Sequence, residues 1–245
     1  MKDYFSSLSD KYALYRPTYP QAIYDFIYPL LKDNATAWDC GTGNGQIAQE
    51  LANYFTNVYA TDISQAQLDN AIKLPNIHYS LQPAESTNFD DNSFDLVTVA
   101  QAVHWFNFEK FNAEVKRVGK PGSIICLIGY ELNNITPDVD AVVRYFYNDI
   151  VGPYWDAERK HLENKYSQIP FPYKELETPD IQNIKLWKLE QLIGYLNTWS
   201  SVKHFIKKNG YNPLDKIMNE LKAAWGNQEV RKVTFPIIFK AGRIK

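Results

Sequence analysis

Residues 38–45 read Trp38-Asp39-Cys40-Gly41-Thr42-Gly43-Asn44-Gly45, and this stretch decides how the rest of the chain is interpreted. A short apolar run ends here in an acid, and three alternating glycines lead into a segment with helical spacing. Because glycine has no Cβ, such a loop lets a ligand lie against bare backbone at the carboxyl end of a strand. A dinucleotide fingerprint, G-x-G-x-x-G, would place glycine at position 46, which is Gln46. The third glycine comes one residue early, in the pattern D-x-G-x-G-x-G.

The composition bounds the class of protein. The 245 residues are 45% hydrophobic, enough for one large α/β domain with a full core. A formal charge of -2 without any block of lysine or arginine argues against a nucleic-acid partner. The N-terminal residues 1–10 hold no apolar signal core, and no apolar run is long enough to span a bilayer. Cys40 and Cys126 each lie in a strand-like run, as reduced, buried thiols do, so we expect a cytoplasmic protein.

Strands and helices alternate through the first half of the chain, a rhythm that predicts βαβ units and a parallel sheet. Near-continuous apolar strands predict a sheet that is covered on both faces. A capping box, Ser64 with Gln67 three residues later, predicts the start of a helix. We expect strands over residues 35–39, 58–61, 77–81, 94–100 and 124–130, helices over 46–55 and 108–118, and a turn at 120–122.

The rhythm breaks after Tyr130, where many of the aromatic residues gather. Aromatic side chains make up 15% of the whole chain, which exceeds what a simple core needs. We expect helices over residues 138–151, 189–205 and 212–225, an irregular segment over 152–179, and strands over 181–187 and 230–239, the last of them broken by Pro236.

Four further features follow the glycine loop in order. They are an acid that ends the second strand (Asp62), Ala84-Glu85 after the third, Phe-Asp-Leu-Val at 94–97 and Lys-Pro-Gly at 120–122. Over residues 35–130 the chain thereby resembles the class I S-adenosylmethionine-dependent methyltransferases with a type 11 methyltransferase domain. The resemblance implies an α/β, Rossmann-like fold, in which a seven-stranded, mostly parallel sheet carries helices on both faces and a helical or irregular cap. It also implies S-adenosyl-L-methionine as the cofactor.

Each part of this sulfonium cofactor needs a different partner. The glycine loop lets the backbone approach the methionine tail and the ribose, and the helix after it offers unpaired N–H groups and a positive end. Asp39 is placed to meet the ammonium group of the tail. Asp62 is placed to accept both ribose hydroxyls, a role that an acid about 20 residues after the first glycine also has in dinucleotide folds. Ile63 is placed to cover one face of the adenine.

The resemblance adds further cofactor residues. It implies that Ala84 and Glu85 contact the adenine and that Ala100 and Gln101 lie next to the methionine tail. With Arg16, introduced below, the expected cofactor residues are Arg16, Asp39, Gly41, Thr42, Gly43, Gly45, Asp62, Ile63, Ala84, Glu85, Ala100 and Gln101.

Three segments outside the glycine loop point to a narrower group. Residues 12–20 (YALYRPTYP), 101–106 (QAVHWF) and 195–202 (YLNTWSSV) together resemble the trans-aconitate methyltransferase-type group, in particular its fungal-like branch. By this resemblance Arg16 reaches the carboxylate of the cofactor tail, and the N-terminal segment covers the pocket as a lid. The alternative for Arg16 is a surface arginine stacked on a tyrosine. The residues expected around the substrate are Tyr4, Tyr12, Tyr15, Trp105, Tyr130, Arg144 and Trp199.

The expected organisation is a single methyltransferase domain over residues 1–245. Residues 1–34 form the N-terminal lid segment, and residues 35–130 form the cofactor-binding core. Residues 131–180 are a substrate cap insertion, and residues 181–245 supply the strands and helices that complete the sheet. No obligate protein partner is expected.

The reaction implied is an in-line displacement at a methyl group on positive sulfur, in which the enzyme aligns the reactants and excludes water. A carboxylate acceptor is ionised at pH 7 and needs no base, but it needs cations or donors to hold it. The candidates for this role are Arg144, Arg159, His161 and Lys165 in the cap, together with His104 near the sulfur. A phenol, thiol or amine needs a base, and His104, after the end of a strand, is the candidate catalytic residue.

Our leading hypothesis is the O-methylation of a carboxylic acid on a small molecule. Three alternatives stay open: methylation of a small phenol, thiol or amine with His104 as base, a non-catalytic cofactor-binding protein, and an NAD(P)-dependent oxidoreductase. Gln46 in place of a third glycine argues against the oxidoreductase. The four histidines are widely scattered and show no metal-ligand spacing, so no metal is expected.

Overall fold

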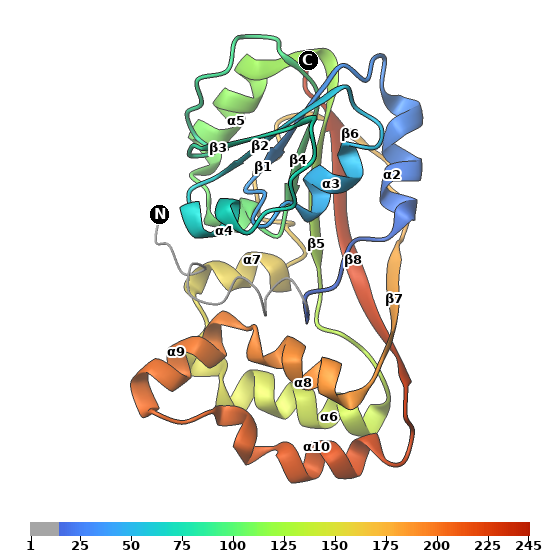
Figure 1. Cartoon of the computed structure of the whole chain (residues 1–245), viewed down its shortest axis with the longest axis vertical. Coiled ribbons are helices and arrows are strands. Elements are labelled where there is room, and N and C mark those ends of the chain that lie inside the picture. The colour runs from blue at the N-terminus through green and yellow to red at the C-terminus, as the bar shows by residue number, and fades with distance from the viewer. Residues whose placement is uncertain (1–14) are drawn as a thin grey trace.

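The strands of the sheet carry most of the architecture. The computed structural model describes residues 15–245 (Figure 1). Among these residues the sheet has the strand order β3-β2-β1-β4-β5-β8-β6, and β7 pairs with β8 outside this path. Strands β1 to β5 are parallel to their neighbours, whereas β8 runs antiparallel to β5, β6 and β7. The strands span Thr36–Cys40 (β1), Asn57–Asp62 (β2), Ile77–Leu81 (β3), Phe94–Ala100 (β4), Gly119–Tyr130 (β5), Lys174–Leu176 (β6), Gln182–Trp187 (β7) and Arg231–Arg243 (β8).

The predicted α/β fold with a seven-stranded, mostly parallel sheet is confirmed, and β7 is an eighth strand beside one end of β8. Alternate side chains of the central strands pack into two cores, one on each face of the sheet. In β4, Leu96 packs in the core that includes α2 (Gln21–Ile27) and α3 (Gln46–Leu51). Its neighbour Val97 packs in the core formed with α5 (Phe108–Val118). Both faces are therefore covered, as the apolar strands predicted.

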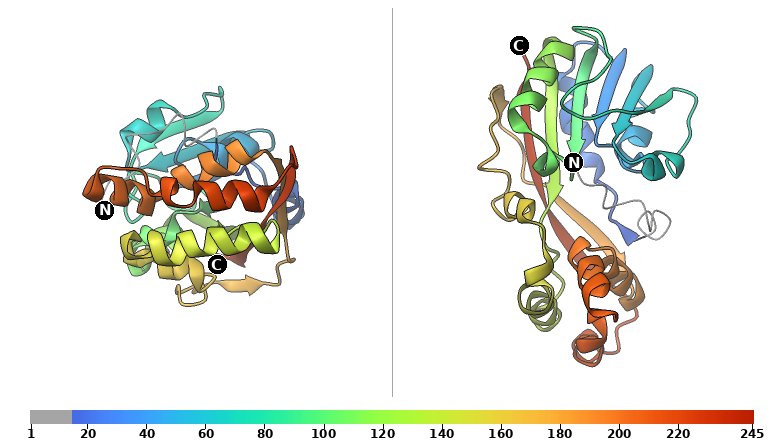
Figure 2. Two further views of the ribbon diagram at one scale, coloured as in Figure 1. Left: turned by 90° about the horizontal axis from the view of Figure 1, so that it is seen from below. Right: turned by 90° about the vertical axis from the view of Figure 1, so that its left-hand side faces the viewer.

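A helical layer lies beyond the carboxyl ends of the parallel strands (Figure 1, Figure 2). It consists of α6 (Pro137–Tyr145), α8 (Leu189–Asn197), α9 (Ser200–Asn209) and α10 (Met218–Trp225). We expected residues 181–245 to complete the sheet. Strand β8 does so, but α8, α9 and α10 extend the cap instead. None of the helices within residues 15–245 combines the length and the apolarity that a bilayer crossing needs.

Strand β8 joins the two layers. Its C-terminal half pairs with β5 and β6, and its N-terminal half pairs with β7. We expected Pro236 to break this strand, but β8 runs through it. The strand changes partner here, because β7 pairs as far as Pro236 and β5 pairs from Ile237 onward. A residue without a backbone N–H is tolerated at such a change of partner.

Other boundaries also differ from the sequence-based expectation. The segment over 152–179 is not wholly irregular, since it contains η4 (Gly152–Tyr154), η5 (Ala157–Arg159), α7 (Lys160–Glu163) and β6. The helix expected over 189–205 is two helices, because the chain is extended at Trp199 (φ -66°, ψ 138°). The expected turn at 120–122 lies inside β5, which begins at Gly119. The helix from Ser64 is confirmed as α4 (Gln65–Asp69), whose N-terminal N–H of Gln67 donates to Ser64 Oγ.

Candidate functional site

The glycine loop joins β1 to α3 at the carboxyl edge of the sheet. Gly41, Gly43 and Gly45 have positive φ angles (69°, 57° and 84°), a conformation that favours glycine. Two of them are also closely packed: a Cβ at Gly41 would lie 2.6 Å from Ala102 Cβ, and one at Gly45 would overlap the Tyr79 hydroxyl. At Gly43 the nearest atom would be 3.9 Å away. The middle glycine therefore presents bare backbone to open space.

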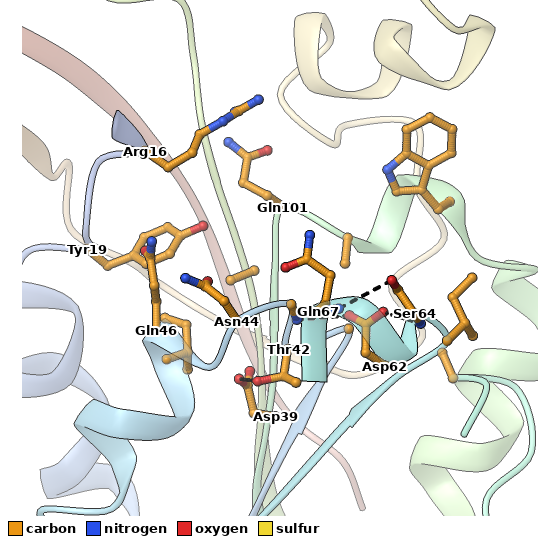
Figure 3. A pocket seen from close by; sticks show the side chains of 18 of the residues that line it. Arg16, Tyr19, Asp39, Thr42, Asn44, Gln46, Asp62, Ser64, Gln67 and Gln101 are labelled. Carbon is orange, nitrogen blue, oxygen red and sulfur yellow. Dashed lines mark hydrogen bonds between the residues drawn. The ribbon is translucent and has the colours of Figure 1, made fainter. Parts of the chain in front are cut away.

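A pocket of about 1090 Å³, counted with its open mouth, lies over this loop (Figure 3). Ten of the twelve residues expected to bind the cofactor line it, namely Arg16, Asp39, Gly41, Thr42, Gly43, Asp62, Ile63, Ala84, Ala100 and Gln101. Gly45 does not line it, because this residue precedes α3 and packs against Tyr79. Glu85 does not line it either, because its Oε1 accepts a hydrogen bond from the backbone N–H of Asn107 (2.8 Å).

Asp39 lies buried at the floor of the pocket, with 1% of its surface exposed. The hydroxyl of Thr42 donates to its Oδ2 (2.5 Å), and the hydroxyl of Thr98 donates to its Oδ1 (2.9 Å). Burial raises the pKa of Asp39 to about 6, the nearby Asp62 carboxylate adds to the rise, and the hydroxyl hydrogen bonds oppose it. A cation placed beside this carboxylate would favour its ionised form.

Asp62 ends β2 and points toward the pocket (Figure 3). The backbone N–H of Gly43 donates to its Oδ2 (2.8 Å), and the N–H of Ser64 donates to its Oδ1 (2.9 Å). Two backbone donors thus set the orientation of the carboxylate and tie it to the glycine loop. Each carboxylate oxygen carries more than one lone pair, so a carboxylate held in this way can also accept the two hydroxyls of a diol.

The sequence-based prediction missed several pocket residues. Asn44 and Gln46 alternate with the glycines of the loop, and Gln67 comes from the first turn of α4. Gln82 follows β3. Tyr19, labelled in Figure 3, comes from the segment before α2. Asn44 and Gln46 had a local signal, because the spacing of the glycines places the residues between and after them at the same edge. Gln82 had one too, because it follows a parallel strand that ends there, whereas Gln67 and Tyr19 are brought in by packing.

The residues of this pocket fit S-adenosyl-L-methionine. The oriented carboxylate of Asp62 suits the ribose diol, and the buried carboxylate of Asp39 suits the ammonium group of the methionine tail. Ile63 and Ala84 offer apolar surface for the adenine, and the open backbone at Gly43 lets the cofactor approach closely. These individual roles stay predictions.

A second, smaller cavity adjoins the first and faces the helical layer. The two cavities share Arg16, Gln101 and Trp105. Gln101 follows β4 with a φ angle of 54°, a strained conformation for a residue other than glycine and one that recurs at functional sites. The other residues lining the second cavity are His104, Trp155, Asp156, Arg159, Leu162 and Ser200.

His104 lines the second cavity and not the pocket over the glycine loop. Its side chain is buried, and its Nδ1 lies 3.5 Å from the hydroxyl of Tyr166. Burial lowers the pKa of His104 to about 3, and the charges of Arg159 and His161 act in the same direction. The imidazole is therefore neutral at pH 7 and is a weak base, since an effective general base has a pKa near the working pH.

The residues expected around the substrate separate into groups. Trp105 and Tyr130 line the larger pocket, and Arg16 Nη1 donates to the Tyr130 hydroxyl (2.7 Å). Arg144 lies exposed on α6 and borders neither cavity, because the inward face of that helix carries Val139 and Val143. Tyr4 and Tyr12 lie outside the described residues.

Two further aromatic residues take structural positions. Trp199 is buried and packs against Phe146, Tyr147, Trp155 and Tyr195, so it supports the cavity wall from behind. Tyr15 is half-buried and packs closely on Gly194 of α8. Neither residue lines a cavity.

Of the four cap residues proposed to hold a carboxylate, only Arg159 lines the second cavity, where it is joined by the neutral His104. Lys165 forms an ion pair with Glu131 (2.9 Å), and His161 packs against Phe108. Within residues 15–245, no group of three or more His, Cys, Asp or Glu side chains is arranged to hold a metal ion.

Comparisons with known proteins agree with this geometry. The family model described as "Methyltransferase domain" matches residues 38–127. A Dictyostelium discoideum protein named as a methyltransferase is 34% identical over 243 residues, covering 96% of this chain and 92% of that protein. A solved structure named as a type II methyltransferase, from Anaeromyxobacter dehalogenans, is 39% identical with a TM-score of 0.86, covering 94% of this chain and 98% of that one.

A more distant structure shares the fold alone. It is Haemonchus contortus phosphoethanolamine N-methyltransferase 2, 18% identical with a TM-score of 0.52, covering 99% of this chain and 58% of that chain. The whole-length similarity to the two nearer proteins, together with the family model, establishes the family. The chain belongs to the class I S-adenosylmethionine-dependent methyltransferases, and S-adenosyl-L-methionine is its methyl donor.

Proposed function

We propose that this enzyme transfers a methyl group to a carboxylate oxygen of a small molecule. The observation that carries the proposal is the second cavity, which opens beside the cofactor pocket and is lined by two arginines, Arg16 and Arg159. Guanidinium groups match the planar geometry of a carboxylate and remain charged at any working pH. A carboxylate is ionised at pH 7, so the site needs cations and no base.

The residues that line the two cavities have separate roles in this proposal. Asp39 holds the ammonium of the cofactor tail, Asp62 holds the ribose, and Arg16 stands between tail and acceptor. When bound, the cofactor supplies a methyl group on positively charged sulfur. The acceptor oxygen forms the new bond to the methyl carbon as the carbon–sulfur bond breaks, and that bond's electron pair stays on sulfur. No proton is transferred, which suits a site whose histidine is neutral and weakly basic.

The same observations weigh on the alternatives. A phenol, thiol or amine acceptor would rely on His104 as base, and a pKa of about 3 makes that role inefficient at pH 7. A non-catalytic binding protein would have no use for an acceptor cavity beside the methyl donor. The resemblance to the trans-aconitate-type group rests on three short segments and supports a small acid as acceptor.

The wider proposal follows from the same fold. The chain acts as a single domain, in which the segment before α2, including Arg16 and Tyr19, borders the cofactor pocket and residues 131–180 contribute the acceptor side. The lid expected over residues 1–34 does not extend through α2, because this helix packs in the core against the sheet. It works in the cytoplasm, where Cys40 and Cys126, both buried and free, stay reduced. It requires no nucleic acid, membrane or protein partner.

The first experiment tests the cofactor site. Isothermal titration with S-adenosylhomocysteine should show binding to the wild-type protein and its loss in Asp62→Ala. The matched control is Asp69→Ala, which removes an acid from the exposed side of α4. Unchanged binding in Asp62→Ala would show that Asp62 does not bind the cofactor.

The second experiment tests the acceptor chemistry. The enzyme is incubated with methyl-labelled cofactor and pools of carboxylic acids, phenols, thiols and amines, and the products are treated with mild alkali. A methyl ester releases labelled methanol, whereas aryl ethers, thioethers and methylamines keep the label. Alkali-stable product alone would contradict carboxylate methylation.

A further inference from the structure

The second cavity contains an arginine, Arg159, that pairs with no carboxylate among the described residues within 4.0 Å. Arg159 Nε donates to the Tyr147 hydroxyl (3.0 Å), and its guanidinium lies over the rings of Trp155 (4.6 Å) and Tyr147 (5.4 Å). The Tyr147 hydroxyl in turn donates to Glu163 (2.6 Å). The stacked rings hold the guanidinium in place, and its charge faces a cavity.

The same turn also carries an acceptor that lacks a donor. Asp156 precedes η5 and lines the cavity, and its Oδ2 is inaccessible to solvent with no hydrogen-bond partner among the described residues. The Nδ1 of His204 lies 3.8 Å from this oxygen, beyond hydrogen-bond distance, and 3.0 Å from the carbonyl oxygen of Tyr154. A buried acceptor without a donor is costly, so this position favours a ligand that donates.

Asp156 and Arg159 lie close together but do not pair with each other. Asp156 is the N-cap of η5 and Arg159 is its last residue, and the backbone N–H of Arg159 donates to the carbonyl of Asp156 (3.0 Å). Because both side chains line the same cavity, one small molecule can contact both of them.

The guanidinium of Arg159 decides the sign of that ligand. Among the described residues Arg159 forms no ion pair, and His104, which lines the same cavity, is neutral. Arg159 therefore favours an anionic group, and its positive charge on the same turn disfavours a cationic donor at Asp156.

We propose that the acceptor is a hydroxy acid, in which Asp156 accepts a hydrogen bond from a hydroxyl beside a carboxylate held by Arg159. This deepens the function proposed above and rests on it. Asp156 is thus the residue that selects acids with a donor over acids without one. An α-amino acid offers the same pair of groups with an ammonium in place of the hydroxyl, and the experiment separates the two.

The test measures binding and does not depend on methyl transfer. Succinate, malate and aspartate differ at one carbon only, which carries hydrogen, hydroxyl or ammonium. Each acid is titrated by calorimetry into the wild-type protein with and without S-adenosylhomocysteine. We expect malate to bind about tenfold more tightly than succinate, as one hydrogen bond to a charged group predicts.

Asp156→Ala should bring malate to the affinity of succinate without weakening succinate. The Asp156 side chain makes no capping hydrogen bond, so the turn does not depend on it. The control is Glu158→Ala on the same turn, whose side chain lines neither cavity and should keep the preference. Arg159→Ala should weaken all three acids alike, and Lys160→Ala should weaken none.

Several outcomes would overturn the inference. They are equal affinity for malate and succinate in the wild type, a preference that survives in Asp156→Ala, the tightest binding by aspartate, or no binding of any of the acids at about 10 mM. Binding of S-adenosylhomocysteine is measured in parallel on each variant. If the wild-type protein does not bind S-adenosylhomocysteine, the proposed function is wrong. If it binds S-adenosylhomocysteine but shows no preference for malate, only the hydroxy-acid inference is wrong.

Discussion

At the scale of single residues, the role proposed for Asp39 predicts that cofactor binding is coupled to protonation. The free protein holds this buried carboxyl with a pKa of about 6, and an ammonium group bound beside it would favour its ionised form. Binding should therefore release a proton from Asp39 at low pH. From this linkage we expect the Kd for S-adenosylhomocysteine to rise about tenfold between pH 7 and pH 5.

Calorimetric titrations across this pH range test the linkage. Asp39→Asn should bind weakly, with a Kd that changes little over the same range. The exposed Asp69→Asn on α4 serves as the control and should follow the wild type. A wild-type Kd that stays constant down to pH 5 would contradict the role given to Asp39.

The raised pKa of Asp39 also affects the stability of the free protein, but in the opposite direction: this stability falls as the pH rises, whereas cofactor binding becomes tighter. The native state holds the Asp39 proton more tightly than the unfolded chain, whose pKa is 3.8. The stabilisation from this group is fully present below pH 3.8 and is lost as the pH rises through about 6. Asp39→Asn should therefore unfold at a higher temperature than the wild type at pH 7.5 when no cofactor is present. Thermal unfolding followed by circular dichroism measures this, and a lower unfolding temperature would contradict the assignment.

Two glycines of the loop should respond differently to alanine. Gly45→Ala places a Cβ on the Tyr79 hydroxyl at a φ angle of 84°, so it should lower the free energy of unfolding by about 2 kcal/mol or more. Gly43→Ala has room for its Cβ and should cost only about 1 kcal/mol of stability, through its φ angle of 57°. Its methyl group enters the pocket and should abolish S-adenosylhomocysteine binding. Urea unfolding and calorimetry on both variants check this pair, and normal binding by Gly43→Ala would contradict it.

At the scale of elements, Glu85 belongs to the start of α5. Asn107 caps this helix by accepting from the N–H of Lys110 (3.1 Å), and Glu85 accepts from the N–H of Asn107 (2.8 Å). Because Glu85 does not line the pocket, Glu85→Ala should lower the free energy of unfolding by about 1 kcal/mol, as the loss of a helix-capping contact does. It should leave the Kd for S-adenosylhomocysteine within about twofold. A large loss of affinity with unchanged stability would instead support a contact with the adenine.

At the scale of the whole molecule, the proposed reaction takes place where the two cavities adjoin. The glycine loop and the strand ends contribute the cofactor pocket, and Asp156 and Arg159, at η5, line the second cavity. The proposed reaction uses no titrating base, because His104 is neutral above a pKa of about 3 and a carboxylate acceptor is ionised above about pH 5. With saturating cofactor, kcat/KM for the acid should be constant from pH 7 to pH 9. A rate that rises tenfold per pH unit in this range would indicate a general base and contradict the proposal.

The cofactor half of the molecule was largely predictable from local sequence. The glycine loop, Asp62 and the alternating strands each depend on residues within a few positions, and all of them reach the same edge because parallel strands end together. The misplaced residues have tertiary causes. Glu85 is turned to α5 by Asn107, and Arg144 faces outward because Val139 and Val143 face inward. The passage of β8 through Pro236 likewise depends on a change of partner strand.

The sequence by itself therefore determined the class of methyl donor, because the loop that receives it is a continuous stretch of backbone whose glycines permit only certain conformations. The tertiary structure alone decided the acceptor side. Arg16, Gln101, Asp156 and Arg159 come from segments far apart along the chain, and only the packing of these segments brings them to one cavity. The buried acceptor oxygen of Asp156, which has no hydrogen-bond donor among the described residues, is a property of that packing and leaves no local pattern in the sequence.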